Sequence, residues 1–181
     1  MGKILDAIRA RTWTRALPKS PSAQLNLVMR AEKGSTRAVA ARLGVSQRTI
    51  QRWVKGEQQP SARIAGRLQE EAAKSHQPRV TARARRAAGA GGIRVETRAT
   101  FGFRAAPGST DDARLRRITD DLPRELAGRL WDAAAAGDES QLQRLVGEGL
   151  GHAYFRDGGR RADGLDVELT DIDYIDLDWN Q

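Results

Sequence analysis

The pattern of apolar and polar positions changes several times along the chain. From residue 2 to about residue 74, apolar side chains recur every three or four positions, the period of an amphipathic helix. Between residues 93 and 103 they alternate with polar ones, the period of a half-buried strand. Helical spacing returns from residue 110 to 155, and residues 165–179 alternate again. We therefore expect an α+β protein that is mostly α-helical.

The sequence RAVAARLGVSQRTIQRWVK, residues 37–55, predicts two helices joined by a tight turn. Gly44 can take the positive φ that the turn requires, and Ser46 is placed to cap the second helix. The residues expected between the helices are apolar or small: Val39, Ala40, Leu43, Val45, Ile50 and Trp53. An ordinary helical hairpin would have similar spacing, but the small, apolar and glycine positions together favour a helix-turn-helix motif.

The second helix of this motif would present five polar side chains to solvent. They are Gln47, Arg48, Gln51, Arg52 and Lys55. Glutamine pairs with adenine edges, arginine with guanine edges, and both lysine and arginine with phosphates. We therefore predict that these residues contact DNA. With helices expected at residues 2–16, 21–31 and 61–74, the motif would form a DNA-binding domain over residues 1–75.

The charge is divided unevenly along the chain. The whole sequence has 31 Lys and Arg against 23 Asp and Glu, a net charge of +8, and a pI of about 10.7. Residues 1–98 hold 21 basic and 6 acidic residues, whereas residues 99–181 hold 10 and 17. A basic first half and an acidic second half suggest two roles, of which one is contact with nucleic acid.

Several classes of protein are disfavoured by composition. The chain has no cysteine, which excludes disulfides, thiolate metal sites and cysteine nucleophiles. Its two histidines, His76 and His152, lie too far apart in sequence to suggest a metal site. No apolar run is long enough to span a membrane, and the first residues lack a signal-peptide core. We expect a cytoplasmic protein at the nucleoid, with no cofactor of its own.

Residues 76–92, HQPRVTARARRAAGAGG, predict a basic, glycine-rich linker. It would either follow DNA phosphates or simply be a solvated helix end with a linker. Residues 93–181 would then form a second, α+β domain. We expect helices near residues 110–120, 123–136 and 139–155, with a core of Leu115, Leu122, Leu126, Leu130, Trp131, Leu142, Leu145, Val146 and Leu150.

The last alternating stretch, residues 165–179, predicts a strand that pairs with residues 93–103 and complements their arginines. Its carboxylates lie on or near one side: Asp166, Glu168, Asp171, Asp173, Asp176 and Asp178. A carboxylate metal site is the alternative, but acidic alternation on a strand is more often a solvated face. The acidic strand could also contact a protein partner or shield the basic half of the chain.

Three stretches of the second domain are more specific. They are GGIRVETRATFGF, PGSTDDARLRRIT and YFRDGGRRADGLDVELTDIDYI. Together with VAARLGVSQRTIQRWVK, and in the same order and spacing, they resemble the Tpg-type telomere terminal proteins of linear actinobacterial chromosomes and plasmids. The resemblance runs through most of the chain. Because many regulators would match the helix-turn-helix segment equally well, the other three stretches carry the resemblance.

The resemblance implies that the chain is a protein primer and not an enzyme. In that family a threonine hydroxyl accepts the first deoxynucleotide from a DNA polymerase, and the protein stays covalently attached to the DNA 5′ end. The motif match places this threonine at Thr110. The family has two threonines before the Asp-Asp pair where this chain has Ser109-Thr110, so Ser109 is the second candidate. The implied partners are telomeric DNA with its 3′ overhang, the polymerase, and a telomere-associated protein that recruits the terminal protein.

The residue types around Thr110 can also be assessed without the resemblance. The polymerase supplies the divalent metal ions, so the primer needs only an exposed hydroxyl on a positioned backbone. Ser109 and Asp112 have the spacing of a capping box, which predicts Ser109 as the N-cap and leaves the Thr110 hydroxyl free. A helix N-terminus also favours an incoming phosphate, although Asp111 and Asp112 oppose it unless a metal or Arg114 offsets them. From spacing alone, a simple helix cap is the competing interpretation.

Other threonines and two other functions remain as alternatives. Thr100 would lie on a strand and Thr119 inside a helix, so both are less free than Thr110. A noncovalent helix-turn-helix regulator of transcription or plasmid replication would need no priming residue and would bind a palindromic operator as a dimer. A nuclease or integrase would need convergent carboxylates or a tyrosine nucleophile, and we expect Tyr154 and Tyr174 to pack in the interior.

Overall fold

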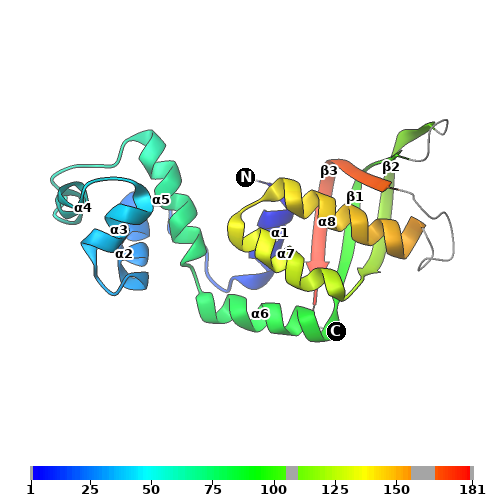
Figure 1. The fold of residues 1–181 in the computed structure, drawn as a ribbon, viewed down its shortest axis with the longest axis horizontal. Coiled ribbons are helices and arrows are strands. Elements are labelled where there is room, and N and C mark those ends of the chain that lie inside the picture. The colour runs from blue at the N-terminus through cyan, green and yellow to red at the C-terminus, as the bar shows by residue number, and fades with distance from the viewer. Residues whose placement is uncertain (1, 105–109, 156–165, 180–181) are drawn as a thin grey trace. The chain divides into compact units, whose positions relative to one another are not determined.

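The computed structural model describes residues 2–104, 110–155 and 166–179. The chain divides into two compact units. One comprises residues 14–78, which we call the helical unit; the other comprises residues 1–13 and 79–181, which we call the sheet unit. The mostly α-helical α+β class predicted from the sequence is confirmed (Figure 1).

The helical unit contains the four helices expected on and around the helix-turn-helix. They are α2 (Pro21–Ala31), α3 (Thr36–Leu43), α4 (Gln47–Val54) and α5 (Ala62–Lys74). The Ser20 side chain caps α2 by accepting a hydrogen bond from the N–H of Ala23, and Pro21 occupies the first turn. Both residues are common at these positions of a helix start. The helices enclose one apolar core of Leu25, Val28, Val39, Ala40, Leu43, Ile50, Trp53, Ile64, Leu68 and Ala72.

The sheet unit is built on three antiparallel strands in the order β2-β1-β3. β1 (Ile93–Arg104) is central and pairs with β2 (Thr110–Leu122) on one side and β3 (Asp166–Asp178) on the other. The predicted pairing of the two alternating segments, β1 with β3, is therefore confirmed. A bulge interrupts this pairing between Arg98 and Thr100, close to Asp171, which has a positive φ of 45°.

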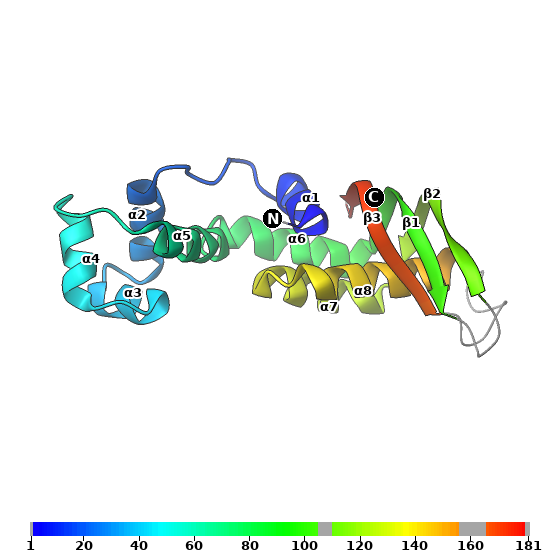
Figure 2. The same cartoon turned by 90° about the horizontal axis from the view of Figure 1, so that it is seen from above.

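Helices cover one face of the sheet and leave the other face to solvent. α7 (Glu125–Ala136) and α8 (Glu139–Leu150) form a hairpin that lies along this face (Figure 2). A short π-helical turn, Gly151–Phe155, continues α8. The alternation of β1 explains the burial, because Ile93, Val95, Thr97, Ala99 and Phe101 all face the helices and are at most 4% exposed. The expected core of α7 and α8 is buried as predicted.

Three segments differ from the sequence-based expectations. The first is α1 (Lys3–Thr12), which was expected in a DNA-binding domain of residues 1–75 and instead packs in the sheet unit. Its Ile4, Leu5 and Ile8 are buried in the core formed with the sheet. The carboxylate of Glu139 accepts hydrogen bonds from the N–H groups of Ile4 and Leu5 at 2.8 and 3.0 Å. Helical spacing predicted the apolar face of α1 correctly but could not say which core it joins.

The second difference is α6 (Pro78–Gly91), a helix where residues 76–92 were expected to form a linker. The helix has five alanines and four arginines, residues that favour helices, and these outweigh its two glycines, Gly89 and Gly91. Ala84 and Ala88, one turn apart, are 9% and 0% exposed and join the core of the sheet unit. Small buried side chains let α6 approach that core closely.

The third difference is β2, because residues 110–120 were expected to be helical. Leu115, Ile118 and Leu122 have helical spacing, but the segment pairs with β1 along nearly its whole length. As a consequence Ile118 and Leu122 are buried, whereas Leu115, expected in the core, is 52% exposed. Long-range strand pairing has overridden the local pattern.

We predict that Glu139→Ala lowers the free energy of unfolding by about 1–3 kcal/mol, because it removes a charged acceptor from two N–H groups at the start of α1. Chemical denaturation measures this loss, and hydrogen exchange should show faster exchange in α1. Glu148→Ala is the matched control, since that carboxylate makes an exposed ion pair with Arg129 and should cost under about 1 kcal/mol. Equal stability of the two variants would contradict the role of Glu139.

Candidate nucleic-acid interface

The turn between α3 and α4 has the geometry of a helix-turn-helix. Gly44 ends α3 with φ 65° and ψ 41°, a left-handed conformation that side chains oppose. The N–H of Val45 donates to the carbonyl of Ala40 at 3.0 Å, closing the turn. The Ser46 hydroxyl then accepts from the N–H of Thr49 at 3.2 Å and caps α4. The roles predicted for Gly44 and Ser46 are therefore confirmed.

α4 is fixed to the helical unit by one strongly apolar face. Ile50 is fully buried and Trp53 is 8% exposed, and both belong to the core that α2, α3 and α5 complete. Because these two residues are three positions apart, they lie on the same side of the helix. The opposite side of α4 is consequently held outward by packing.

The five predicted contact residues all lie on this outward side. Gln47, Arg48, Gln51, Arg52 and Lys55 are exposed. Within the part of the chain that the structure describes, the side chains of Arg48, Gln51 and Arg52 make no hydrogen bond or ion pair. Lys55 makes only a long, exposed contact of 3.8 Å to Glu57. The amide and guanidinium groups are therefore available to hydrogen-bond donors and acceptors of another molecule, and contact with DNA remains our prediction for them.

Gln47 differs from the other four because its side chain is already oriented. Its Nε2 donates to the hydroxyl of Thr36, the first residue of α3, at 2.9 Å. This bond uses one amide donor and sets the direction of the Gln47 carbonyl oxygen. Thr36 was not identified from the sequence, since a threonine eleven residues away gives no local signal of such a contact.

An ionic cluster holds α3 against its neighbours. The Arg42 guanidinium donates to Glu32 at 2.7 Å and to Glu71 of α5 at 2.6 and 2.9 Å. Burial pushes the pKa of Glu71 upward, but hydrogen bonds from Lys74 and Arg42 outweigh it and leave the pKa below its ordinary value. Glu71 is thus charged at neutral pH and the cluster is intact. It ties α3 to the C-terminal end of α5.

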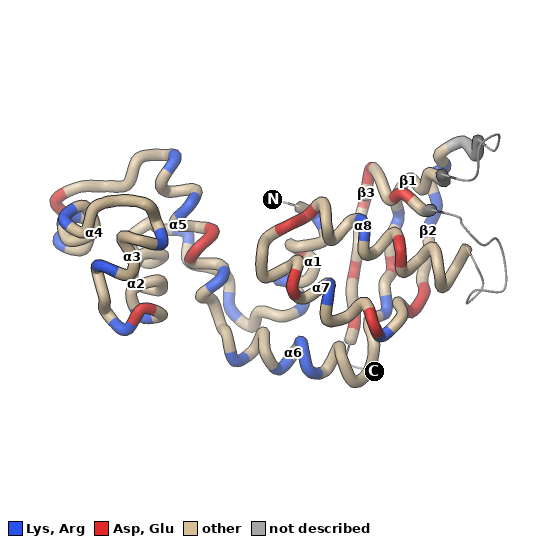
Figure 3. Tube along the Cα trace, viewed as in Figure 1, with Lys and Arg blue, Asp and Glu red and all other residues tan. Residues whose placement is uncertain are grey.

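The charge imbalance of the chain resides in the helical unit. Residues 14–78 include twelve Lys and Arg but only four Asp and Glu, whereas the remaining residues include nineteen of each. The whole net charge of +8 is therefore carried by residues 14–78. In Figure 3, basic positions outnumber acidic ones on α2 to α5, whereas the two kinds are interspersed along the strands of the sheet unit. Polyanion binding is favoured at the helical unit.

The open face of the sheet is occupied by charge pairs. Arg94 binds Asp121 of β2 through two hydrogen bonds of 2.9 Å, and Arg98 lies 3.4 Å from Asp173 of β3. The acidic strand β3 thus complements one β1 arginine, and β2 complements the other. Among the described residues, no three carboxylate or imidazole groups come together as potential metal ligands.

Tyr174 and Tyr154, expected in the interior, are 37% and 48% exposed. The Tyr174 hydroxyl donates to Glu96 at 2.8 Å, and Arg117 donates to the same carboxylate oxygen. The hydrogen bond to Glu96 raises the pKa of Tyr174, which disfavours the phenolate form that a nucleophile needs. Tyr174 therefore belongs to the network of charged and polar groups on the open face.

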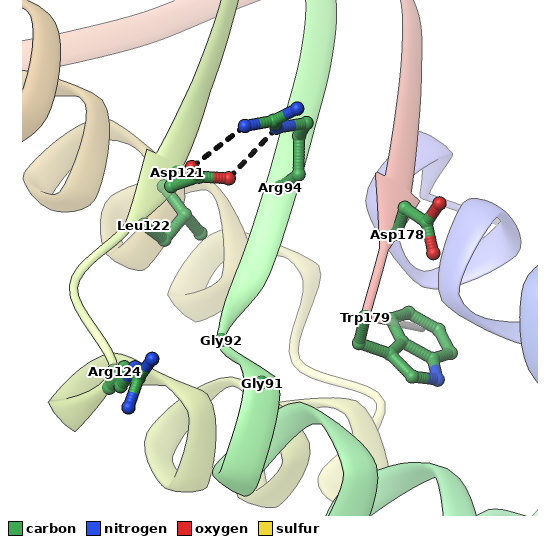
Figure 4. A pocket seen from close by; sticks show the side chains of 8 residues that line it. All are labelled: Gly91, Gly92, Arg94, Asp121, Leu122, Arg124, Asp178 and Trp179. Carbon is green, nitrogen blue, oxygen red and sulfur yellow. Dashed lines mark hydrogen bonds and ion pairs between the residues drawn. The ribbon is translucent and has the colours of Figure 1, made fainter. Parts of the chain in front are cut away.

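A small pocket of about 140 Å³ lies where β1 begins (Figure 4). It is lined by Gly91, Gly92, Arg94, Asp121, Leu122, Arg124, Asp178 and Trp179. Two arginines face two aspartates here, and Arg94 is already paired with Asp121. The hydrogen bond from Arg94 holds the pKa of Asp121 below its ordinary value. With opposite charges balanced, the pocket has no excess of one sign with which to bind an anion.

Thr110 is the first residue of β2 and pairs through its backbone register with Arg104. The predicted helix N-terminus is therefore absent at Thr110, and the capping argument for its free hydroxyl is wrong. Ser109 lies outside the described residues. Thr119 is on β2 and not in a helix, while Thr100 is on β1 as predicted. Position at the end of a strand hairpin, beside residues 105–109, is what distinguishes Thr110 from the other two.

The comparisons with known proteins agree with the geometry of the helical unit. A helix-turn-helix family model matches residues 29–74, which include the end of α2 and the whole of α3, α4 and α5. A helix-turn-helix DNA-binding domain is therefore present in this part of the chain. No curated protein and no solved structure matches the chain. No described helix is both long and apolar enough to cross a membrane.

We predict that Arg48→Ala and Arg52→Ala each weaken binding to a mixed-sequence DNA duplex, by about 1–3 kcal/mol where a side chain makes a good base contact. Fluorescence anisotropy at fixed salt measures the loss. Arg63→Ala, an exposed arginine on α5, removes the same charge and should change affinity less than twofold. Wild-type affinity in both α4 variants, or an equal loss in Arg63→Ala, would refute the assignment of α4.

Proposed function

We propose that this chain is a telomere terminal protein, which binds DNA ends, primes end-patching synthesis through a threonine hydroxyl and stays linked to the 5′ end. One observation carries the proposal beyond DNA binding. The three stretches of the family resemblance contain most of β1, β2 and β3, the three strands of one sheet. Segments far apart in the chain, with Arg98 paired to Tyr174, thus belong to one structural element. A resemblance confined to the helix-turn-helix would not include this sheet.

Thr110 remains our choice for the priming residue, on a different physical basis from helix capping. It opens β2 at the end of the β1–β2 hairpin, where a backbone is anchored on one side by strand pairing. A residue at such a position can enter the active site of another protein without disturbing a core. The polymerase would supply the metal ions that activate the attacking hydroxyl and stabilise the leaving pyrophosphate, so the primer itself needs no general base. Ser109 stays the second candidate.

The two units suit two separate tasks. The helical unit, with its net charge of +8 and the exposed face of α4, would hold telomeric DNA. The sheet unit, which is electrically balanced, would meet the polymerase and the telomere-associated protein, with β3 as a candidate contact for one of them. The site of action would be the ends of a linear replicon.

A priming assay tests the proposal. Wild-type protein incubated with the host polymerase, telomeric single-stranded template and labelled deoxynucleotides should acquire label that survives boiling in SDS. Thr110→Ala should abolish labelling, because no hydroxyl remains at that position, and Thr110→Ser should retain part of it. Ser109→Ala is the matched control and should label normally. Labelling lost in Ser109→Ala and kept in Thr110→Ala would move the site to Ser109.

The main alternative is a noncovalent helix-turn-helix regulator. It is favoured by the fact that the family match covers only residues 29–74, which many regulators share. A regulator would bind a palindromic operator as a dimer, with half-sites about one helical turn apart. The DNA binding of such a regulator would also be unchanged by Thr110→Ala. Footprinting of the wild-type protein on replicon ends and on its own promoter separates the two functions.

A further inference from the structure

Helix α6 carries three arginines to which the proposed function assigns no role. Arg79, Arg83 and Arg86 are exposed, and in the described structure their side chains make no hydrogen bond or ion pair. The helix PRVTARARRAAGAG contains no acidic residue at all. Its fourth arginine, Arg85, differs because it pairs with Asp132 of α7 at 2.8 Å. The run of blue positions along α6 is visible in Figure 3.

The three arginines share one side of the helix. Their spacing of four and then three residues places them within about 60° of arc at 100° per residue. Ala84 and Ala88, the buried residues of α6, lie on the opposite side. Packing of the alanines against the sheet unit therefore fixes the direction of the arginines outward. We call Arg79, Arg83 and Arg86 the α6 arginine face.

This arrangement is unfavourable for the isolated helix. Like charges one turn apart repel each other, and a cation near the first turn, as at Arg79, opposes the helix dipole. No carboxylate of α6 relieves either effect. An anionic ligand along this face would offset both. Arginine, with its planar fork of donors, matches phosphate oxygens particularly well.

We propose that the α6 arginine face binds the phosphate backbone of DNA and forms a second contact, in the sheet unit, in addition to that made by α4. The proposal rests on the DNA-binding function proposed above. From Arg79 to Arg86 the helix rises about 10 Å, over which one strand of B-DNA carries about three phosphates. We assign the three arginines to phosphate oxygens rather than base edges, so their contribution is independent of DNA sequence.

Such a contact would add to affinity without adding specificity. α4 would distinguish sequences through base edges, while α6 would hold the backbone wherever the protein is bound. Because α6 follows α5 after residues 75–77 and belongs to the other unit, DNA contact would involve both units. The sheet unit, and Thr110 with it, would thereby be kept on the DNA.

The salt dependence of binding tests the inference. Affinity for a labelled mixed-sequence 30-bp duplex is measured by anisotropy from low to moderate KCl for the full chain. The triple variant Arg79→Gln, Arg83→Gln, Arg86→Gln should lower the slope of log K against log salt by about 0.9 per lost phosphate contact, or roughly 2–3 in all. The triple lysine variant, which keeps the charges, should restore most of the slope. Glutamine and lysine both favour helices, so α6 should still form.

A control with matched charge isolates the face. Arg85→Gln, Arg129→Gln and Arg144→Gln together also remove three charges from the sheet unit; the first two arginines pair with Asp132 and Glu148, and the third binds Gln141. This variant should keep the wild-type slope. If the glutamine variant of the α6 arginine face keeps it as well, the inference is wrong although the protein still binds DNA. If the wild-type protein fails to bind the duplex at low salt, the proposed function fails together with it.

Discussion

The organisation of this chain depends on the docking of α1 against the sheet unit, where the Glu139 carboxylate binds the start of the helix. Two N–H groups that an α-helix leaves unpaired at its beginning receive a charged acceptor from a residue 135 positions away. Ile4, Leu5 and Ile8 then enter the core beneath the sheet. With α1 docked, the helix-turn-helix region becomes an insertion between residues 13 and 79 of the sheet unit. It is joined to that unit at both of its ends.

A DNA-binding domain that is tethered at both ends suits a protein whose second unit must remain near the DNA. The helical unit has the properties of DNA contact: its own core, a glycine-closed turn, the Arg42 cluster and the entire net charge. The sheet unit has balanced charge and satisfies its open face internally, through Arg94 with Asp121 and Arg117 with Glu96. Within the described part of this unit, α6 is basic without any acidic residue, and β3 is acidic without any basic one. The electrostatics thus separate the chain more clearly than the secondary structure does.

The sequence allowed a good prediction wherever one local rule dominated. Gly44, Ser46 and the apolar pair of α4 each obey such a rule, and the alternation of β1 and β3 is equally direct. Predictions were wrong where the deciding contact is distant in sequence. α1 joins the sheet unit through Glu139 and the core that its apolar face enters, and β2 is a strand because β1 pairs with it. The helix of α6 follows from its composition, but the docking of Ala84 and Ala88 depends on a core assembled from both ends of the chain.

The same limit applied to the candidate sites. Exposure of the α4 side chains followed from the helical period, but the hydrogen bond from Gln47 to Thr36 depends on how two helices meet. For Thr110 the spacing of a capping box was misleading, since serine, threonine and aspartate are also common next to turns. The pairing of residues 110–122 with β1 could have been suspected from complementary charges on the two segments. Arg94 pairs with Asp121, and Arg117 pairs with Glu96.

The most direct test of the central claim is mass spectrometry of the protein isolated from its host after exhaustive nuclease digestion. If the chain is a terminal protein, a fraction should carry the mass of a residual nucleotide, and fragmentation should place it on Thr110. A remnant on Ser109 would preserve the function and change the site. Protein that is entirely unmodified, with no SDS-resistant DNA before digestion, would contradict the priming role and leave a noncovalent DNA-binding regulator.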